Sequence, residues 1–299
     1  MVASLLQLSS VPPREGSLAR WCRAPVVSLT CAAFAATLSA TTRAEAQGST
    51  NTKLRITYLA NMGVQLTHGG TTVVIDALHR GALRGYAPLL PATQRALEEG
   101  RAPFERIAVA LVTHRHLDHF DPAAALARLL SDSTMVLVAP IEVIDTLVAR
   151  NTSLRGNRRL RGVRGGERID LPGVSVTVLD LPHNRTRTVG AQNVGYAIDL
   201  GGFRVLHVGD ANPDAEAYTT QQVRSHGARA AIVPVWYLME PDARLIEAIG
   251  ARCYLASHIG PDDTLQVVRR LKDARVPARA LASRGATLDL RDARATGCS

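Results

Sequence analysis

The sequence feature that most constrains the fold is a histidine-rich stretch between an expected strand and an expected helix. Residues 114–119 read His-Arg-His-Leu-Asp-His. The apolar run Ile107–Thr113 before them is typical of a strand covered on both faces. Asp121-Pro122 after them indicates a helix start, with aspartate as the N-cap and proline at the first position. The stretch is therefore predicted to be a strand-to-helix loop, where layered α/β proteins bind ligands.

The side chains of this loop suit a metal ion. Three imidazoles and one carboxylate within six residues cannot all be buried without partners, because burying an unpaired polar group is costly. Alternation along an extended loop sends His114, His116 and Asp118 to one side, and His119 turns with the start of the helix. Imidazole and carboxylate are ligands for zinc, manganese or iron. The alternatives are a solvated polar loop or an ion bound by a single histidine.

Three further candidate ligands, His183, Asp210 and His258, follow β-rich runs elsewhere in the chain. Taken singly, each has another interpretation: His183 as a turn residue, Asp210 as a helix N-cap and His258 as a core histidine. Three strand ends that each deliver a ligand are what a metal site at one edge of a sheet sandwich requires. Together with the histidine loop, they predict a single metal centre.

The remaining sequence predicts strands first and then alternating strands and helices. Expected strands are Leu54–Leu59, Val64–Thr67, Thr71–Ile75, Met135–Ala139, Asn193–Leu200, Phe203–Val208, Ala230–Pro234 and Cys253–Ala256, with a β-rich block at Glu167–Leu181. Expected helices are Thr93–Glu99, Ala123–Leu130, Ile141–Arg150, Pro213–Ser225, Asp242–Ile249 and Asp262–Lys272. Helices covering two β-rich halves predict an α/β fold, a four-layer αββα sandwich. We expect one such domain, residues 47–299.

Composition excludes several classes of protein. The 299 residues are 46% hydrophobic and contain only four cysteines, so the chain is neither disordered nor a disulfide-dense miniprotein. No uninterrupted apolar run reaches the roughly 18 residues of a membrane span. The net charge of +9 is carried mainly by arginines spread along the chain. Without a basic and aromatic patch, a nucleic-acid partner is not expected, and a small-molecule substrate is.

The first 46 residues are predicted to be a signal peptide. Arg14, Arg20 and Arg23 precede an apolar segment, residues 24–40, and Ala44-Glu45-Ala46 fits a small-x-small cleavage site. We therefore expect export to the periplasm or the medium. Cleavage would leave Cys253 and Cys298 as the remaining cysteines. Cys253 is interpreted as a core thiol, and pairing of the two is left open.

The motif His114-x-His116-x-Asp118-His119, followed by His183, Gly209-Asp210 and His258, resembles the metallo-β-lactamase superfamily. The segment Tyr58–Gly63 with Val73–Asp76 is similar to the N-terminal hairpin of that superfamily. The resemblance covers about Lys53 to Thr287, nearly all of the expected mature chain.

This resemblance implies an αββα fold and a hydrolytic centre with two divalent metal ions, commonly zinc. By the family pattern, one metal is bound by His114, His116 and His183, the second by Asp118, His119 and His258, and Asp210 bridges both. Asp118 and Asp210 would then be the catalytic carboxylates beside an activated water. Asp76 is similar to an aspartate of the family that supports the histidine loop without binding metal.

The resemblance also narrows the reaction. True β-lactamases of the superfamily generally carry serine or cysteine at or near the bridging position, so Asp210 counts against antibiotic hydrolysis. The compact layout is more similar to the ascorbate-6-phosphate lactonase-like and phospholipase-D-type hydrolases, although Ala77 stands where many relatives have proline. We therefore expect cleavage of an ester, lactone or phosphodiester. The alternatives are a β-lactamase and a non-catalytic metal-binding protein on the same fold.

Four side chains are candidate substrate contacts. Arg185 and Arg187, just after His183, are suited to hold a phosphate or carboxylate, which would make the substrate anionic; the alternative is that they point into solvent. Trp236 and Tyr237 follow an expected strand and form either an apolar wall of the site or part of the core. The long connection Leu78–Arg106, which contains Tyr86, is a candidate lid. His207, on an expected buried strand, is interpreted as a supporting histidine.

Overall fold

The computed structural model describes residues 53–81, 85–183, 190–274, 276–291 and 298. All of them belong to one compact unit, Gln47–Ser299. The predicted signal peptide and the candidate substrate contacts Arg185 and Arg187 lie outside the described residues. Within the described part of the chain, no helix is long and apolar enough to cross a membrane.

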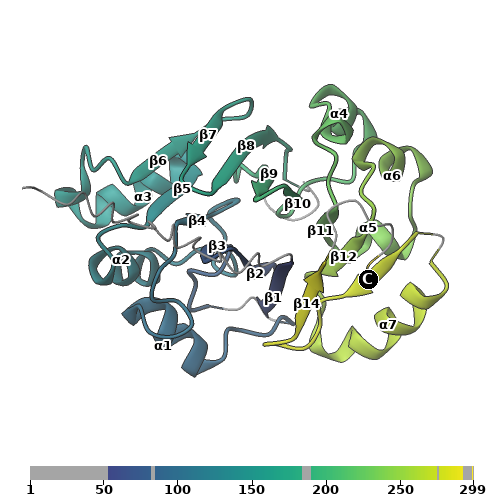
Figure 1. Cartoon of the computed structure of the whole chain (residues 1–299), viewed down its shortest axis with the longest axis horizontal. Coiled ribbons are helices and arrows are strands. Elements are labelled where there is room, and N and C mark those ends of the chain that lie inside the picture. The colour runs from purple at the N-terminus through teal and green to yellow at the C-terminus, as the bar shows by residue number, and fades with distance from the viewer. Residues whose placement is uncertain (1–52, 82–84, 184–189, 275, 292–297, 299) are drawn as a thin grey trace, which may run out of the picture. The chain divides into compact units, whose positions relative to one another are not determined.

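Two seven-stranded sheets form the centre of the unit (Figure 1). The first has the order β14-β1-β2-β3-β4-β5-β6, antiparallel from β14 to β3 and parallel from β3 to β6. Its strands are β1 Leu54–Ala60, β2 Gly63–His68, β3 Thr71–Ile75, β4 Val109–Leu111, β5 Val136–Pro140, β6 Leu160–Val163 and β14 Thr287–Leu290. The second has the order β13-β12-β11-β10-β9-β8-β7. Its strands are β7 Arg168–Leu171, β8 Val174–Asp180, β9 Val194–Leu200, β10 Phe203–His207, β11 Ala230–Pro234, β12 Tyr254–Ser257 and β13 Ala278–Ala280.

Helices cover the outer face of each sheet (Figure 1). On the first sheet these are α1 Pro91–Glu99, α2 Pro122–Ser131 and α3 Ile141–Arg150, followed by the short turn η1 Thr152–Leu154. On the second they are α4 Ala215–Thr220, η2 Val223–His226, α5 Trp236–Met239, α6 Ala243–Ile249, η3 Pro261–Asp263 and α7 Thr264–Lys272. The predicted four-layer αββα sandwich is confirmed.

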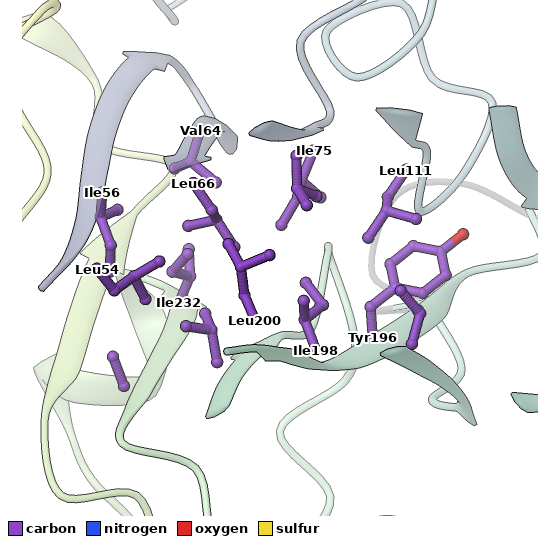
Figure 2. Close-up of a cluster of buried hydrophobic side chains, with 14 of the residues drawn as sticks. Leu54, Ile56, Val64, Leu66, Ile75, Leu111, Tyr196, Ile198, Leu200 and Ile232 are labelled. Atoms are coloured by element: carbon purple, nitrogen blue, oxygen red, sulfur yellow. The ribbon is translucent and has the colours of Figure 1, made fainter. Parts of the chain in front are cut away.

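The main hydrophobic core lies between the two sheets. In Figure 2, side chains of β1 to β4 face those of β9 and β11 across this layer. Alternate positions of one strand, such as Tyr196, Ile198 and Leu200 of β9, point into it, as a strand period of two requires. Tyr196 is the polar member, and its hydroxyl donates a 2.7 Å hydrogen bond to the carbonyl of Val112, just after β4. This bond ties the two sheets together next to the histidine loop.

Several predicted element boundaries are correct and others are wrong. Strands Thr71–Ile75 and Ala230–Pro234 and helix Ile141–Arg150 have the predicted limits. The single helix predicted at Pro213–Ser225 is instead two pieces, α4 and η2, because Gln222 adopts a left-handed conformation with φ of 50° between them. The sequence patterns missed β6, β13, β14 and α5, all of which are short.

The interpretation of Cys253 as a core thiol is wrong, and the pairing that the sequence left open is present: Cys253 and Cys298 form a disulfide. Cys253 immediately precedes β12 and is fully buried. The bond therefore fastens the end of the chain to the strand that leads into His258.

Candidate metal centre

The seven candidate ligands come together at one edge of the sandwich. His114, His116, Asp118 and His119 lie on the loop between β4 and α2. The other three follow β8, β10 and β12, which run in the same direction in the second sheet. Because carboxyl ends of parallel strands meet at one edge, these loops converge there.

The ligand atoms form three overlapping groups, each with its atoms within 4.8 Å of one another. The groups are His114, His116 and His183; His114, His119 and Asp210; and Asp118, His119 and His258. The first and third correspond to the two metal positions that the sequence resemblance implies.

Asp210 lies between these groups. Its Oδ2 is 3.1 Å from Nε2 of His258, 3.5 Å from Nε2 of His119 and 3.8 Å from Nε2 of His183. A single carboxylate oxygen therefore approaches histidines of both outer groups.

The unpaired atoms of the cluster show that metal ions fit it. Nε2 of His114, His119 and His258 and Oδ1 of Asp118 and Asp210 are buried without a hydrogen-bond partner among the described residues. Buried polar atoms normally have partners, so a convergent set without them needs another way to be satisfied. Nitrogen and carboxylate oxygen donors are the set that zinc, manganese and iron accept.

Asp76 fixes the orientation of two of the histidines. Its Oδ2 accepts hydrogen bonds from Nδ1 of His119 at 2.9 Å and from Oγ1 of Thr113 at 2.7 Å, and its Oδ1 accepts from the Thr113 amide. Since the Thr113 hydroxyl proton points at Asp76, the hydroxyl oxygen accepts from Nδ1 of His114 at 3.0 Å. In the neutral form that binds a metal, both imidazoles thus carry their proton on Nδ1, and the lone pair of Nε2 faces the cluster.

Asn61, in the turn between β1 and β2, holds the third group. Its side-chain amide donates to Oδ2 of Asp118 at 2.7 Å. Its backbone carbonyl accepts from the amide of His258 at 3.3 Å and from the hydroxyl of Ser257. The N-terminal hairpin therefore connects two candidate ligands that come from opposite sheets.

Asn193 performs the same task for the segments that carry His183 and Asp210. Its side-chain amide donates to the carbonyls of Leu181 and Val208, and its Oδ1 accepts from the amide of Asp210. Gly209 is required beside it: φ is +59°, and a Cβ atom there would lie 2.7 Å from Cβ of Thr113. A side chain at position 209 would therefore separate the two ligand loops.

Backbone strain is concentrated at the same place. Of the four described non-glycine residues with positive φ, three are Asn61, Asp76 and His258, at 50°, 47° and 59°. Such conformations cost free energy and persist where surrounding contacts enforce them, often at functional sites.

The electrostatics of the cluster favour positive charge among its carboxylates. Burial would lower the pKa of His119, but Asp210, Asp76 and Asp118 together raise it well above its ordinary value. Burial likewise opposes protonation of His258, whose pKa Asp210 and Asp118 nevertheless raise to about 8. Burial would raise the pKa of Asp210, yet His119 and His258 hold it well below its ordinary value. A bound cation would be stabilised by the same carboxylates.

The two candidate substrate contacts that the structure describes, Trp236 and Tyr237, lie in different environments. The ring of Trp236 lies beside His258, with centroids 5.2 Å apart. Tyr237 is instead a core residue: it is 1% exposed, and its hydroxyl bonds to the carbonyl of Ala211 and to the Tyr218 hydroxyl. His207 is buried and donates from Nε2 to the carbonyl of Met62, as a supporting histidine would.

Sequence patterns missed three residues that organise the site. Asn61, Thr113 and Asn193 are not candidate metal ligands. Asn61 and Asn193 bond to segments distant in the sequence, and Thr113 links the adjacent His114 to the distant Asp76. No local motif marks them, because their partners are chosen by the tertiary structure.

With this geometry, comparison with known proteins defines the class. The family model for the beta-lactamase superfamily domain matches residues 71–280, more than half of the chain. The chain belongs to the beta-lactamase superfamily.

Individual relatives agree with this assignment. A UPF0173 metal-dependent hydrolase from Polaromonas sp. strain JS666 is 29% identical over 172 residues, which are 53% of this chain and 58% of that protein. The match thus spans little more than half the length of this curated relative.

Solved structures show the same fold. The metallo-beta-lactamase fold protein YhfI from Bacillus subtilis has a TM-score of 0.55 at 15% identity, over 80% of this chain and 99% of that one. An isothiocyanate hydrolase from Delia radicum gut bacteria also has a TM-score of 0.55 at 15% identity, over 82% of this chain and 100% of that one.

Proposed function

We propose that this protein is an exported metal-dependent hydrolase whose two divalent metal ions, most simply zinc, act on an ester, lactone or phosphodiester bond. The observation that carries the proposal is the position of Asp210, whose Oδ2 approaches histidines of both outer donor groups. One group would hold a metal through His114, His116 and His183, the other through Asp118, His119 and His258, with Asp210 shared. The similarity to the Polaromonas metal-dependent hydrolase supports the hydrolase class.

The protein residues would each have a defined task. Metal ions in such a site lower the pKa of a bound water towards neutrality and polarise the bond under attack. By accepting a hydrogen bond from Nδ1 of His119, Asp76 selects the neutral tautomer whose Nε2 lone pair would bind a metal. Asp118 and Asp210 would also serve as the catalytic carboxylates that take up the proton of the attacking water.

Export is supported by two independent features. Arg14, Arg20 and Arg23, the apolar segment after them and the small-residue site at Ala44–Ala46 form a signal-like leader. The Cys253–Cys298 disulfide suits an oxidising compartment, because such bonds are rare in the reducing cytosol. Determining the N-terminal residue of the protein recovered from the periplasm and the medium tests the leader; a chain that retains residue 1 in the cytosol would contradict export.

Elemental analysis of the purified chain, combined with a hydrolysis screen, tests the proposed centre. We expect about two metal equivalents per chain, fewer in an Asp210→Ala variant, and cleavage of 4-nitrophenyl esters, lactones or bis(4-nitrophenyl) phosphate. A chain without metal that also takes up no added zinc or manganese would contradict the proposal. Cephalosporin cleavage at rates comparable to those of simple esters would contradict the assigned bond class.

A further inference from the structure

A cavity of about 390 Å³ lies beside the metal centre, between the segment after β3, helix α5 and helix α7. His258 belongs both to its lining and to the candidate metal ligands. His258 is only 4% exposed, whereas Asp263, Gln266 and Arg270 at the α7 wall are exposed. The cavity therefore leads from the metal centre to solvent along α7.

Aromatic rings form the inner part of this cavity. The Tyr86 ring meets the His258 imidazole edge-on with centroids 4.1 Å apart, and the Trp236 ring contacts the same imidazole at 5.2 Å. Val235 and Met239 add apolar surface next to Trp236. Flat hydrophobic groups pack well against such rings, and a methionine side chain adapts to their shape. The inner walls thus suit a ring more than a highly hydrated group.

The charges at the outer, solvent-facing end of the described lining balance. Asp263 and Arg270 contribute one acidic and one basic side chain, and Gln266 between them is neutral. A cavity that selects anions gathers several cationic or N–H donors at one point. The expectation of an anionic substrate depends on Arg185 and Arg187, which lie outside the described residues, and this lining gives it no support.

We propose that the cavity binds an uncharged ring of the substrate, such as a lactone ring or the aryl group of an ester, next to the bond that is cleaved. This inference rests on the proposed hydrolase function. Tyr86 and Trp236 would then determine specificity from two segments that the fold brings to opposite sides of His258.

Trp236 itself provides the test. The chain contains two tryptophans, Trp21 and Trp236, so a full-length Trp21→Phe variant reports fluorescence from Trp236 alone. The probe is 4-nitrobenzyl alcohol, an uncharged ring whose nitro group quenches indole on contact. We expect saturable quenching, with a dissociation constant at least tenfold lower than that of the charged ring 4-nitrobenzoate. Nitromethane, which has no ring, should quench only linearly.

A matched pair of variants tests whether the probe binds in this cavity. Adding Tyr86→Ala should raise the dissociation constant of 4-nitrobenzyl alcohol at least fivefold. Adding Leu90→Ala should not change it, since Leu90 belongs to the same connecting segment but does not line the cavity. Linear quenching by every probe, an unchanged affinity in Tyr86→Ala, or tighter binding of 4-nitrobenzoate would overturn the inference.

This measurement separates the inference from the proposed function, because it requires no turnover. Saturable binding by a chain that neither holds metal nor hydrolyses any substrate would uphold the cavity and reject the function. Hydrolysis by a chain that shows only linear quenching would uphold the proposed function and reject the cavity as a ring-binding site.

Discussion

The side-chain amide of Asn61 donates a hydrogen bond to Oδ2 of Asp118 at 2.7 Å, across 57 positions of sequence. The backbone carbonyl of the same residue accepts from the amide of His258. A single turn of the N-terminal hairpin therefore sets the separation between two members of one donor group. The other outer group, His114, His116 and His183, has no such contact to Asn61 among the described residues.

We predict that Asn61→Ala weakens one metal position selectively. Asp118 would lose its hydrogen-bond donor, and loss of such supporting contacts costs about 10- to 100-fold in metal affinity. Titration with zinc against a chelating indicator should show one equivalent retained and the second weakened. Asn151→Ala, which removes an asparagine that caps η1, is the control. Equal weakening of both equivalents would contradict this prediction.

Asp76→Asn should reduce metal affinity at both positions and destabilise the fold. The amide replaces one acceptor oxygen with a donor facing groups that donate to Asp76, namely the Thr113 amide and hydroxyl and Nδ1 of His119. Breaking a buried network of this kind costs about 1–3 kcal/mol of unfolding free energy. Urea denaturation monitored by circular dichroism measures this cost, and an unchanged midpoint would show that the network is not needed.

His116→Ala should abolish hydrolysis and leave the fold largely intact. His116 lies on a loop and is partly exposed, so truncation creates no core cavity. It removes one of the three donors that it shares with His114 and His183. Activity, metal content and the thermal unfolding temperature should be measured together. Full turnover with unchanged metal content would remove His116 from the proposed centre.

Reduction of the Cys253–Cys298 disulfide should lower stability. The bond closes a loop of sequence separation 45, and cross-links of this kind stabilise proteins by about 2–4 kcal/mol, in part by restricting the unfolded chain. Thermal unfolding with and without dithiothreitol measures the difference. A Cys253→Ser/Cys298→Ser variant should be insensitive to the reductant, and a wild-type chain that is equally insensitive would contradict the prediction.

The pairing of β1 with β14 should weaken in acid. Hydrogen bonds and charge from Arg55 and Lys53 hold the pKa of Asp289 below its ordinary value. A carboxylate with a lower pKa in the folded state contributes stability above its unfolded pKa of about 4, and this contribution is lost as the pH falls below that value. Such partly exposed pairs contribute up to about 1 kcal/mol.

Comparing wild type with Asp289→Asn across pH tests this contribution. The difference in unfolding free energy should be constant from pH 7 to pH 5 and shrink below pH 4. A difference that grows in acid would have the wrong sign. Asp170→Asn, which removes a more exposed partner of Arg168, serves as the control with little expected effect.

Much of the fold follows from local sequence patterns. The strand predicted at Asn193–Leu200, which is β9, and the predicted N-cap Asp121 before Pro122 both appear in the structure, because strand period and helix capping depend on neighbouring residues. The short edge strands β13 and β14 were not predicted, since runs of three or four residues carry too little pattern. Their place in the sheets depends on pairing with β12 and β1.

The sequence by itself determined the set of candidate ligands, because their residue types and strand-end positions can be read locally. The tertiary structure decided which atoms of that set face one another. It placed Asp210 between two histidine groups, joined Asp118 to His258 through Asn61, and paired Cys253 with Cys298. Each of these relationships joins residues that are far apart in the chain. Their distances depend on how the two sheets pack, and no local pattern contains that information.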